Sequence, residues 1–333
     1  MDGITIVMAV YNAERFLDRS IGSVINQTYK EWSLLCVDDG STDNSLFILE
    51  QFAAKDGRIR VFHKENGGPA SARAVAYENL TTPYVISLDA DDMFSNDLLE
   101  NMWKIISSEK TNVDCVMPNL LIEQKDGRYM DWFQSYGWHS GDIVTGKWAF
   151  SNYFINNKVH GNCLWKSNLV KKYAVGEVAN YNQLNADECI QHLLFLNSKE
   201  VAIASGAYIY RYNEESITKK MSLKVLQYLD TCKKYILLGN EYDVDAQTLS
   251  LIKEYYIRNI IQLQIRVDKN VTLLRDERRI FIKEIHNAYN DAMQYKNDVK
   301  FADKKNRWLY RLAITSGYCV FRLTCRLFSY IKK

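Results

Sequence analysis

Residues 85–94 read VISLDADDMF, and this stretch decides both the fold and the site that we expect. An apolar run ends directly on three carboxylates, Asp89, Asp91 and Asp92. Carboxylates this close repel one another unless a cation, a basic side chain or water compensates their charge. The stretch therefore predicts a buried strand whose carboxyl end carries a site for a basic group or a metal ion.

Three further apolar runs precede this one, at residues 4–10, 32–37 and 59–63, and a helical pattern follows each run. The first, ITIVMAV, is continuous and rich in β-branched residues, which is typical of a strand buried on both faces. Asn12 follows it and is a good candidate for the cap of the first helix. Short strands that alternate with helices predict an α/β fold with a mostly parallel sheet and right-handed crossovers, in which residues 84–88 form the fourth strand.

The ends of these strands carry polar side chains that could form a site. Tyr11 follows the first strand, Asp38 and Asp39 follow the second, and the acidic run that starts at Asp89 follows the fourth. Parallel strands present their carboxyl ends at one edge of the sheet, where α/β proteins bind ligands. We therefore expect these residues to meet in one site.

Each acidic cluster also has a simpler interpretation. The pair Asp38 and Asp39 lies in VDDGSTD, which could simply be a turn followed by a helix capped by Ser41 or Asp43. Such a turn needs only one of the two carboxylates, so it does not account for the other. The DADD run could be a solvated loop before the helical segment SNDLLENMWKII.

A divalent cation is the partner that we favour for the DADD run. Asp89 and Asp91 are two residues apart and can point to the same side of an extended strand end. Mg²⁺ and Mn²⁺ bind carboxylate oxygens and keep positions for substrate phosphates. The chain has no G-x-x-x-x-G-K-[ST] pattern and no G-x-G-x-x-G after the first strand, so a metal would be the main source of positive charge for a bound diphosphate.

Three segments in sequence order resemble the family 2 glycosyltransferases, which have the GT-A fold: residues 7–45, which contain VYN and VDDGSTD, residues 65–80, ENGGPASARAVAYENL, and residues 84–94. The resemblance is dense over residues 3–100 and looser to about residue 220. It implies a Rossmann-like domain that transfers a sugar, with inversion, from a nucleotide-sugar donor, usually UDP-linked, to an acceptor hydroxyl. Ala9 stands where many members carry Pro, from which we expect little consequence.

The resemblance gives a role to each matching position. Asp91 would be the direct metal ligand, Asp89 would contact the ribose or the metal, and Asp92 is a further candidate for either role. The predicted positions for the nucleotide-sugar are Val10, Tyr11, Asp38, Asp39, Gly68, Arg73, Asp89 and Ala90, and the predicted ligands of Mn²⁺ or Mg²⁺ are Asp89 and Asp91.

An inverting transfer also needs a base that removes the acceptor proton as the diphosphate leaves. Family members usually carry it in a Glu-Asp pair that opens a later helix, and LNADECIQHLLFL matches by position. Asp187 aligns with the base, and Glu188 is the reserve because Ala186 replaces the usual Glu. The alternative is an acidic first turn that interacts favourably with the helix dipole.

The segment HGNCLWKSNLV resembles the acceptor side of the family. His160, Trp165 and Lys166 could contact the acceptor or the diphosphate, and a strand with a core Trp that leads into a helix explains the segment equally well. His192 follows Asp187 by about one turn, and we expect a surface histidine there rather than a third metal ligand.

The composition describes a globular chain with an acidic body and a basic C-terminus. The net charge of +2 gives no field that would attract nucleic acid. Residues 304–333, however, carry eight Lys and Arg and no Asp or Glu. On one helix all of these basic side chains except Lys305 fall within a sector of about 120°, opposite a set of apolar side chains. Such a helix predicts contact with an anionic membrane surface; a C-terminal helix docked on the protein is the alternative, and Gly317 permits a break.

The cysteines and the apolar runs indicate a cytoplasmic chain. Seven scattered cysteines without a C-x-x-C motif favour neither a disulfide framework nor a zinc site. We expect no signal peptide, because the N-terminus lacks a basic region and a cleavage site, and no transmembrane helix, because no charge-free apolar run reaches 18 residues.

We therefore divide the chain into a GT-A domain at 1–220 (nucleotide-sugar half 1–112, acceptor half 113–220), a helical region at 221–300 and a basic amphipathic helix at 301–333. The predicted enzyme adds a hexosyl or N-acetylhexosaminyl group to a lipid-linked glycan, such as a capsule or O-antigen, at the inner face of a bacterial membrane. Its predicted partners are the nucleotide-sugar, the glycan acceptor and the anionic membrane surface, and no nucleic acid. Two alternatives stay open: a nucleotidyltransferase and a catalytically inactive scaffold.

Overall fold

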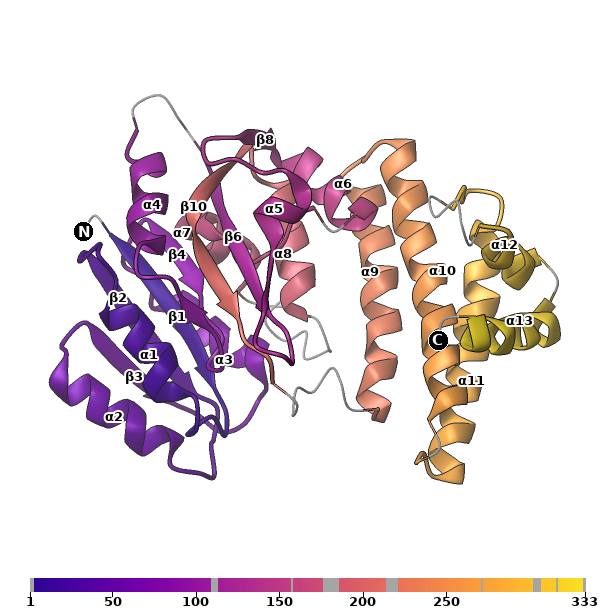
Figure 1. Cartoon of the computed structure of the whole chain (residues 1–333), viewed down its shortest axis with the longest axis horizontal. Helices are drawn as coiled ribbons and strands as arrows, with labels where there is room; N and C mark the ends of the chain where they lie inside the picture. Colours follow the sequence, from indigo (N-terminus) through magenta and orange to yellow (C-terminus); the bar gives the residue numbers. More distant parts are fainter. Residues whose placement is uncertain are drawn as a thin grey trace. The chain divides into compact units, whose positions relative to one another are not determined.

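The computed structural model describes residues 3–108, 113–156, 158–175, 186–213, 221–270, 272–301, 307–315 and 317–331. The chain forms two compact units (Figure 1). The first comprises residues 1–153, 157–182 and 186–214, and the second comprises residues 154–156, 183–185 and 215–333.

Within the described residues, a sheet of ten strands forms the centre of the first unit. Its main path runs β3-β2-β1-β4-β9-β6-β10-β5, with β7 beside β6 and β8 beside β10. The strands are β1 (Ile4–Val10), β2 (Trp32–Asp38), β3 (Ile59–His63), β4 (Tyr84–Ser87), β5 (Met93–Phe94), β6 (Cys115–Glu123), β7 (Tyr129–Asp131), β8 (Ile143–Thr145), β9 (Leu164–Lys166) and β10 (Glu200–Tyr210).

The four strands predicted from the sequence and the mostly parallel α/β fold are confirmed. β1 pairs in parallel with β2 and β4, and β2 pairs in parallel with β3. Further along the path, β9 is antiparallel to both β4 and β6, and β10 is parallel to β6. The carboxyl ends of β1, β2, β4, β6 and β10 therefore share one edge of the sheet, which we call the carboxyl edge.

Helices cover both faces of this sheet (Figure 1). α1 and α4 contribute Ile21 and Leu98 to the core on one face, while α3 and α8 lie against Val85 and Trp165 on the other. The helices up to residue 196 are α1 (Leu17–Ile25), α2 (Ser45–Lys55), α3 (Pro69–Glu78), α4 (Leu98–Ile106), α5 (Trp132–Tyr136), α6 (Gly146–Asn156), α7 (Ser167–Tyr173) and α8 (Ala186–Leu196).

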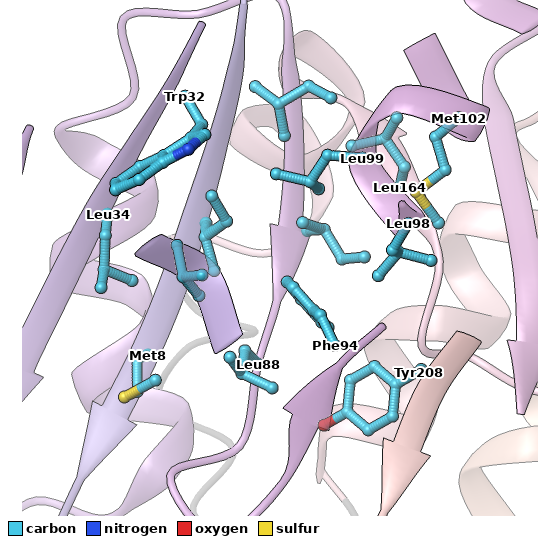
Figure 2. Packing of buried hydrophobic residues seen from close by; sticks show 14 of the residues in the cluster. Met8, Trp32, Leu34, Leu88, Phe94, Leu98, Leu99, Met102, Leu164 and Tyr208 are labelled. Atoms are coloured by element: carbon cyan, nitrogen blue, oxygen red, sulfur yellow. The ribbon is translucent and has the colours of Figure 1, made fainter. Parts of the chain in front are cut away.

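One continuous apolar core packs against the strands that end at the carboxyl edge. Figure 2 shows Met8, Leu34 and Leu88, from β1, β2 and the end of β4, in the same cluster as Phe94 and Tyr208. The rings of Phe94 and Tyr208 meet edge to face, with their centroids 5.7 Å apart. Burial of each such side chain contributes about 1.5–3 kcal/mol, so the core fixes β5 and β10 relative to the first four strands.

The loop after β1 differs from the prediction. Asn12 does not cap α1, which begins at Leu17. Asn12 instead has a φ of 49°, in the left-handed region that Asn tolerates better than most residues. Its Oδ1 accepts a hydrogen bond from the backbone nitrogen of Thr42 at 2.8 Å, and its own backbone nitrogen donates to Ser41 Oγ at 3.0 Å. Asn12 therefore ties the loop after β1 to the loop after β2.

The second unit is helical, as the pattern from about residue 222 onward predicts. Residues 221–300 and 301–333, which the sequence analysis separated, lie in this one unit. Its elements are the 3₁₀ turns η2 (Leu223–Leu226) and η3 (Met293–Tyr295) and the helices α9 (Gln227–Glu241), α10 (Ala246–Lys269), α11 (Arg275–Ala292), α12 (Arg307–Thr315) and α13 (Gly317–Ile331).

The predicted single helix over residues 301–333 is wrong. The chain forms α12 and α13, and Gly317 at their junction has a φ of 81°, which only Gly adopts without strain. α12 packs against α13, and α13 packs against α10. Tyr310 and Phe321 are buried by this packing, whereas Trp308 and Leu323 are exposed. Every helix in the described part of the chain is too short or too polar to cross a bilayer.

Gln27 connects α1 to the segment that follows residues 89–92, which we call the acidic stretch. Its buried Nε2 donates to the carbonyl oxygens of Ser23 at 3.0 Å and Ser95 at 2.7 Å, and its Oε1 accepts from the backbone nitrogen of Leu99 at 3.0 Å. Ser95 in turn exchanges two 2.8 Å hydrogen bonds with Ala207 of β10. One buried amide therefore helps to hold α1, α4 and β10 together.

Replacement of this amide should destabilise the fold. We expect Gln27→Leu to lower the free energy of unfolding by about 2–3 kcal/mol, because it leaves the buried backbone nitrogen of Leu99 without its acceptor. Urea denaturation followed by circular dichroism measures the change. Gln51→Leu, on the exposed side of α2, is the control and should change the midpoint little. Equal losses in the two variants would contradict the role of Gln27.

Candidate active site

Asp92 is buried and turned into the protein. Its Oδ2 accepts a hydrogen bond from the hydroxyl of Tyr208 at 2.8 Å, and its Oδ1 accepts one from the backbone nitrogen of Arg211 at 2.9 Å. Burial, and then the charges of Asp89 and Asp91, raise the pKa of Asp92 to about 8. Asp92 therefore anchors the acidic stretch to the end of β10, with both of its oxygens engaged inside the protein.

Asp89 and Asp91 stay accessible at the carboxyl edge. The side chain of Asp89 is 44% exposed, and its Oδ1 accepts from Nη2 of Arg73 at 2.7 Å. Asp91 Oδ2 accepts from Nδ2 of Asn213 at 3.0 Å. The backbone nitrogen of Asp89 donates to the Tyr208 hydroxyl at 3.1 Å. Each of the two carboxylates is thus oriented by a side-chain donor, and the donor to Asp91 lies 122 residues away in the sequence.

The two accessible carboxylates fit a hard divalent cation but do not enclose one. Carboxylate oxygens are the ligands that Mg²⁺ and Mn²⁺ prefer. After burial, the charges of Asp89 and Asp91 also raise the pKa of Asp92, and a cation bound to these two carboxylates would relieve that repulsion. Across the described ranges, no group of three or more His, Cys, Asp and Glu side chains is placed to hold a metal by itself. A metal at Asp89 and Asp91 would therefore take further ligands from substrate or water.

The loop after β1 presents one of its two predicted ligand-binding side chains. The ring of Tyr11 is 53% exposed, whereas Val10 is buried in the core. Of this pair, only Tyr11 can offer its side chain to a ligand at the carboxyl edge, and Val10 can contribute only its backbone.

Asp39 is buried and holds the Gly-Gly turn before α3. Its Oδ1 accepts from Lys64 Nζ at 2.8 Å and from the backbone nitrogen of Gly67 at 3.0 Å, and its Oδ2 accepts from the backbone nitrogen of Gly68 at 2.7 Å. Gly68 has a φ of 88°, which favours Gly at this position. A carboxylate accepts about four hydrogen bonds, so three are used and about one acceptor position remains for a ligand.

Asp38 is also buried and orients a histidine. Its Oδ2 lies 2.8 Å from Nδ1 of His63 and accepts from the backbone nitrogen of Ser41 at 3.2 Å. Its Oδ1 has no hydrogen-bond partner among the described residues. The side chain of His63 is 54% exposed, whereas that of Asp38 is fully buried. In this pair, therefore, the imidazole faces the solvent.

A cavity beside Asp89 brings α8 to the acidic stretch. Arg73 and Asp89 line it together with Ile190 and Gln191 of α8. Gln191 packs so closely on Gly161 that a Cβ at position 161 would lie 1.6 Å from its Oε1. The absence of a side chain at Gly161 therefore permits the approach of α8 to the site.

The register of α8 favours one of the two predicted bases. Positions three and four residues apart share a helix face, so position 187 lies on the face of Ile190, Gln191 and Leu194, which line the cavity. The side chain of Asp187 lies outside the described residues. Glu188 is half-buried and, by the same spacing, shares its face with only one of these three residues, Gln191.

Lys166 and Trp165 lie elsewhere than at the diphosphate. Lys166 pairs with Tyr84 at the start of β4, because β9 is antiparallel to β4, and its Nζ contacts Asp114 Oδ1 at 2.8 Å. It therefore lies at the edge opposite the carboxyl edge, and the predicted contact with a diphosphate is wrong. Trp165 is buried and packs on Phe195 with centroids 4.9 Å apart, as its core interpretation predicts.

His160 and His192 are both buried, so the expected surface position of His192 is wrong. Nε2 of His160 donates to the carbonyl oxygen of Pro118 at 2.9 Å, and His192 packs against the rings of Phe150 and Tyr153. Burial lowers the pKa of each imidazole to about 4. Both are therefore neutral at pH 7 and act in packing.

The sequence analysis predicted Arg73 but missed three other residues that orient the carboxylates, Tyr208, Asn213 and Lys64. Tyr208 and Asn213 lie 116 and 122 residues from their acidic partners. Lys64 lies within the family-like region, but only the folded turn brings it to Asp39. The sequence contained no periodicity or motif that could have identified these three residues.

The site thus combines the carboxyl edge of an α/β sheet with a buried acidic anchor and two accessible carboxylates beyond the fourth strand. The family model described as Glycosyl transferase family 2 matches residues 5–173, and the chain belongs to this family. The glycosyltransferase resemblance stated from the motifs is therefore confirmed.

Curated relatives agree with this assignment. The chain is 29% identical to glycosyltransferase GlyG of Streptococcus pneumoniae over 231 residues, which are 65% of this chain and 73% of the relative. It is 27% identical to the minor teichoic acid biosynthesis protein GgaA of Bacillus subtilis over 297 residues, 84% of this chain and 64% of that protein. An uncharacterized glycosyltransferase of Haemophilus influenzae is 44% identical over 98 residues, 29% of this chain and 39% of the relative. The chain thus spans less than two thirds of the last two proteins.

Solved structures of TarS from S. aureus have the same fold. TarS 1-349 in complex with UDP-GlcNAc superposes with a TM-score of 0.73 at 15% identity, covering 98% of this chain and 92% of that one. A longer TarS structure gives 0.70 at 18% identity, covering 97% of this chain and 55% of that one. The predicted glycosyltransferase fold is therefore confirmed along almost the whole chain.

The two buried histidines should make the protein sensitive to acid. The folded pKa of each is about 4, and the unfolded value is about 6.5. Between these values the unfolded chain binds protons that the folded chain does not, so stability falls as the pH falls. Each histidine should account for a loss of about 2 kcal/mol between pH 7 and pH 5.

Urea midpoints at pH 7 and pH 5 measure this loss. His160→Gln should reduce the difference between the two pH values, while His139→Gln, at an exposed site, should leave it unchanged. A pH dependence that is the same in wild type and His160→Gln would show that burial does not lower the pKa of His160.

Proposed function

We propose that this chain transfers a hexosyl or N-acetylhexosaminyl group from a UDP-sugar to an acceptor hydroxyl, with inversion at the sugar carbon. The proposal rests on the accessible pair Asp89 and Asp91, which shares the carboxyl edge with the exposed ring of Tyr11. The TarS structures with UDP and UDP-GlcNAc support the choice of a UDP-linked donor.

The nucleotide would bind across the ends of β1 and β2. The ring of Tyr11 would stack on the base, because its exposed face has the apolar character that an aromatic base requires. The remaining acceptor position of Asp39 would take a donor from the base or ribose. Arg73, held by Asp89, would place a positive charge beside the diphosphate.

The transfer would form one bond and break one bond at the anomeric carbon. The acceptor oxygen bonds to this carbon as its bond to the diphosphate oxygen breaks, and the electron pair leaves with UDP. The acceptor proton passes to the carboxylate of Asp187, the base favoured by the register of α8, with Glu188 as the reserve. A base so placed contributes about 10²–10⁴-fold in rate.

Mn²⁺ or Mg²⁺ held by Asp91 and Asp89 would stabilise negative charge on the departing diphosphate. Asn213 would keep the Asp91 carboxylate in position for this role, since it already donates to Oδ2. Asp92 would take no direct part, because Tyr208 and Arg211 engage its oxygens.

Release of free UDP tests the transferase. Wild type should hydrolyse one member of a panel of UDP-hexoses and UDP-N-acetylhexosamines slowly, and chelation of divalent metal should stop it. Asp91→Asn should lower the rate about 100-fold or more, because a neutral amide binds the cation poorly. Asp18→Asn, on the exposed face of α1, is the matched control. Consumption of nucleoside triphosphates would favour the nucleotidyltransferase, and no binding of any nucleotide-sugar would favour the inactive scaffold.

We also propose that the acceptor is lipid-linked and that the second unit binds the anionic cytoplasmic face of a membrane. Residues 304–333 carry eight basic and no acidic residues. Trp308 and Leu312 are exposed one turn apart on α12, and Leu323 and Leu327 are exposed one turn apart on α13. Exposed apolar pairs on short basic helices favour the membrane interface.

Flotation with lipid vesicles tests this localisation. The full chain should float with phosphatidylglycerol vesicles at low salt, and less with phosphatidylcholine vesicles or at high salt. Leu323→Glu with Leu327→Glu should weaken flotation about tenfold or more, since two apolar contacts are lost and two charges added. Leu274→Glu, also exposed but outside α12 and α13, should float as wild type does. Unchanged flotation of the double variant would contradict the proposed membrane face.

A further inference from the structure

Tyr210, Ile122 and Met130 form an apolar row at the carboxyl edge. The register pairs Tyr210 of β10 with Ile122 of β6, and Ile122 with Met130 of β7. Side chains at paired positions lie on the same face of a sheet. Tyr210 is 42% exposed and Met130 is 38% exposed, while Ile122 is partly buried against the core. We call these three residues the edge row.

The edge row adjoins the acidic stretch. Tyr208 lies two residues before Tyr210, on the same face of β10, and its hydroxyl donates to Asp92. The backbone nitrogen of Arg211, directly after Tyr210, donates to the other oxygen of Asp92. Residues two apart on a strand are separated by about 7 Å. Tyr210 therefore lies about 7 Å along β10 from Tyr208, whose hydroxyl contacts Asp89 and Asp92.

The edge row and the proposed nucleotide side lie in different parts of the sheet. Tyr11 and Asp39 follow β1 and β2, on one side of β4 in the strand order. The edge row lies on β6, β7 and β10, on the other side of β4. The acidic stretch connects β4 to β5, which lies next to β10 at the far end of the strand order. Asp89 and Asp91 would therefore lie between a ligand on the edge row and a nucleotide at Tyr11.

The chemistry of the edge row fits a sugar ring. A pyranose has a face of C–H groups and a rim of hydroxyls, so it can bury its face on an aromatic ring while the hydroxyls meet carboxylates. Tyr supplies a rigid apolar surface, and Met adapts to rings of different shape. An acyclic polyol phosphate has no such face to bury on the edge row.

We propose that the edge row is the acceptor platform, on which Tyr210 and Met130 bind the apolar face of a pyranose in the acceptor glycan. This inference rests on the proposed glycosyl transfer and assigns its acceptor class: a chain that ends in a sugar ring. Tyr210 is here a residue that determines acceptor specificity, and it takes no part in binding the donor.

Binding of simple sugars tests the platform without the transfer reaction. Saturation-transfer NMR on the full chain with UDP and Mg²⁺ would use methyl pyranosides of glucose, galactose, mannose and N-acetylglucosamine as probes, and glycerol phosphate as the acyclic comparison. At least one pyranoside should bind, with its strongest signals on the C–H groups of one ring face. Tyr210→Ala should weaken this binding about tenfold, while Tyr210→Phe should keep it.

Tyr129→Ala is the matched control. Tyr129 is 52% exposed and pairs with Glu123, so it precedes Met130 on the opposite face of the same strand. It should bind pyranosides as wild type does. Thermal unfolding of wild type and the variants is measured alongside, and binding is compared only between proteins that are folded at the temperature of the NMR experiment.

Two outcomes would overturn the platform. One concerns binding: either no pyranoside binds wild type better than glycerol phosphate does, or Tyr210→Ala binds the pyranoside as well as wild type does. The other is that Tyr210→Ala slows hydrolysis of the UDP-sugar in the absence of acceptor as much as it weakens pyranoside binding, which would place Tyr210 on the donor. Failure of wild type to release UDP from any donor would instead count against the proposed transfer, and the NMR result would still decide whether the edge row binds sugar.

Discussion

The hydroxyl of Tyr208 accepts a hydrogen bond from the backbone of Asp89 and donates one to the carboxylate of Asp92. This one oxygen joins both ends of the acidic stretch to β10. With Asp92 drawn inward, Asp89 lies beside Arg73 and Asp91 is left near the surface. The separation of one anchoring carboxyl group from two accessible carboxylates leaves Asp89 and Asp91 together at the carboxyl edge, where the proposed cation would bind.

The fold and the gathering of the strand-end carboxylates at one edge were predictable because their signals are local. Apolar runs such as residues 4–10 identify buried strands, and alternation with helices implies parallel pairing, so the carboxylates beyond β4 had to lie at the carboxyl edge. The orientation of those carboxylates was not predictable. It depends on Tyr208 and Asn213, whose contacts span more than a hundred residues of sequence. Lys166 was misplaced for a related reason, because no local pattern reveals that β9 runs antiparallel to β4.

The C-terminus shows how packing overrides periodicity. Leu312 and Ala313 both belong to the apolar set that one continuous helix would place opposite its basic side chains. The structure divides that helix at Gly317, buries Ala313 and leaves Leu312 exposed. Periodicity alone reports which residues are apolar, whereas the choice of buried face depends on the partner helix, which for α12 is α13.

The contact between Asp92 and Tyr208 also sets an order of events during synthesis. The two residues are 116 positions apart, so the ribosome completes all four strands of the β3-β2-β1-β4 group before the hydroxyl that orders the acidic stretch exists. Contacts of this sequence separation form late and slowly in folding. A nascent chain that ends before β10 can pack its first strands but leaves the acidic stretch without its anchor. Only a chain that extends through β10 can have its carboxylates in place.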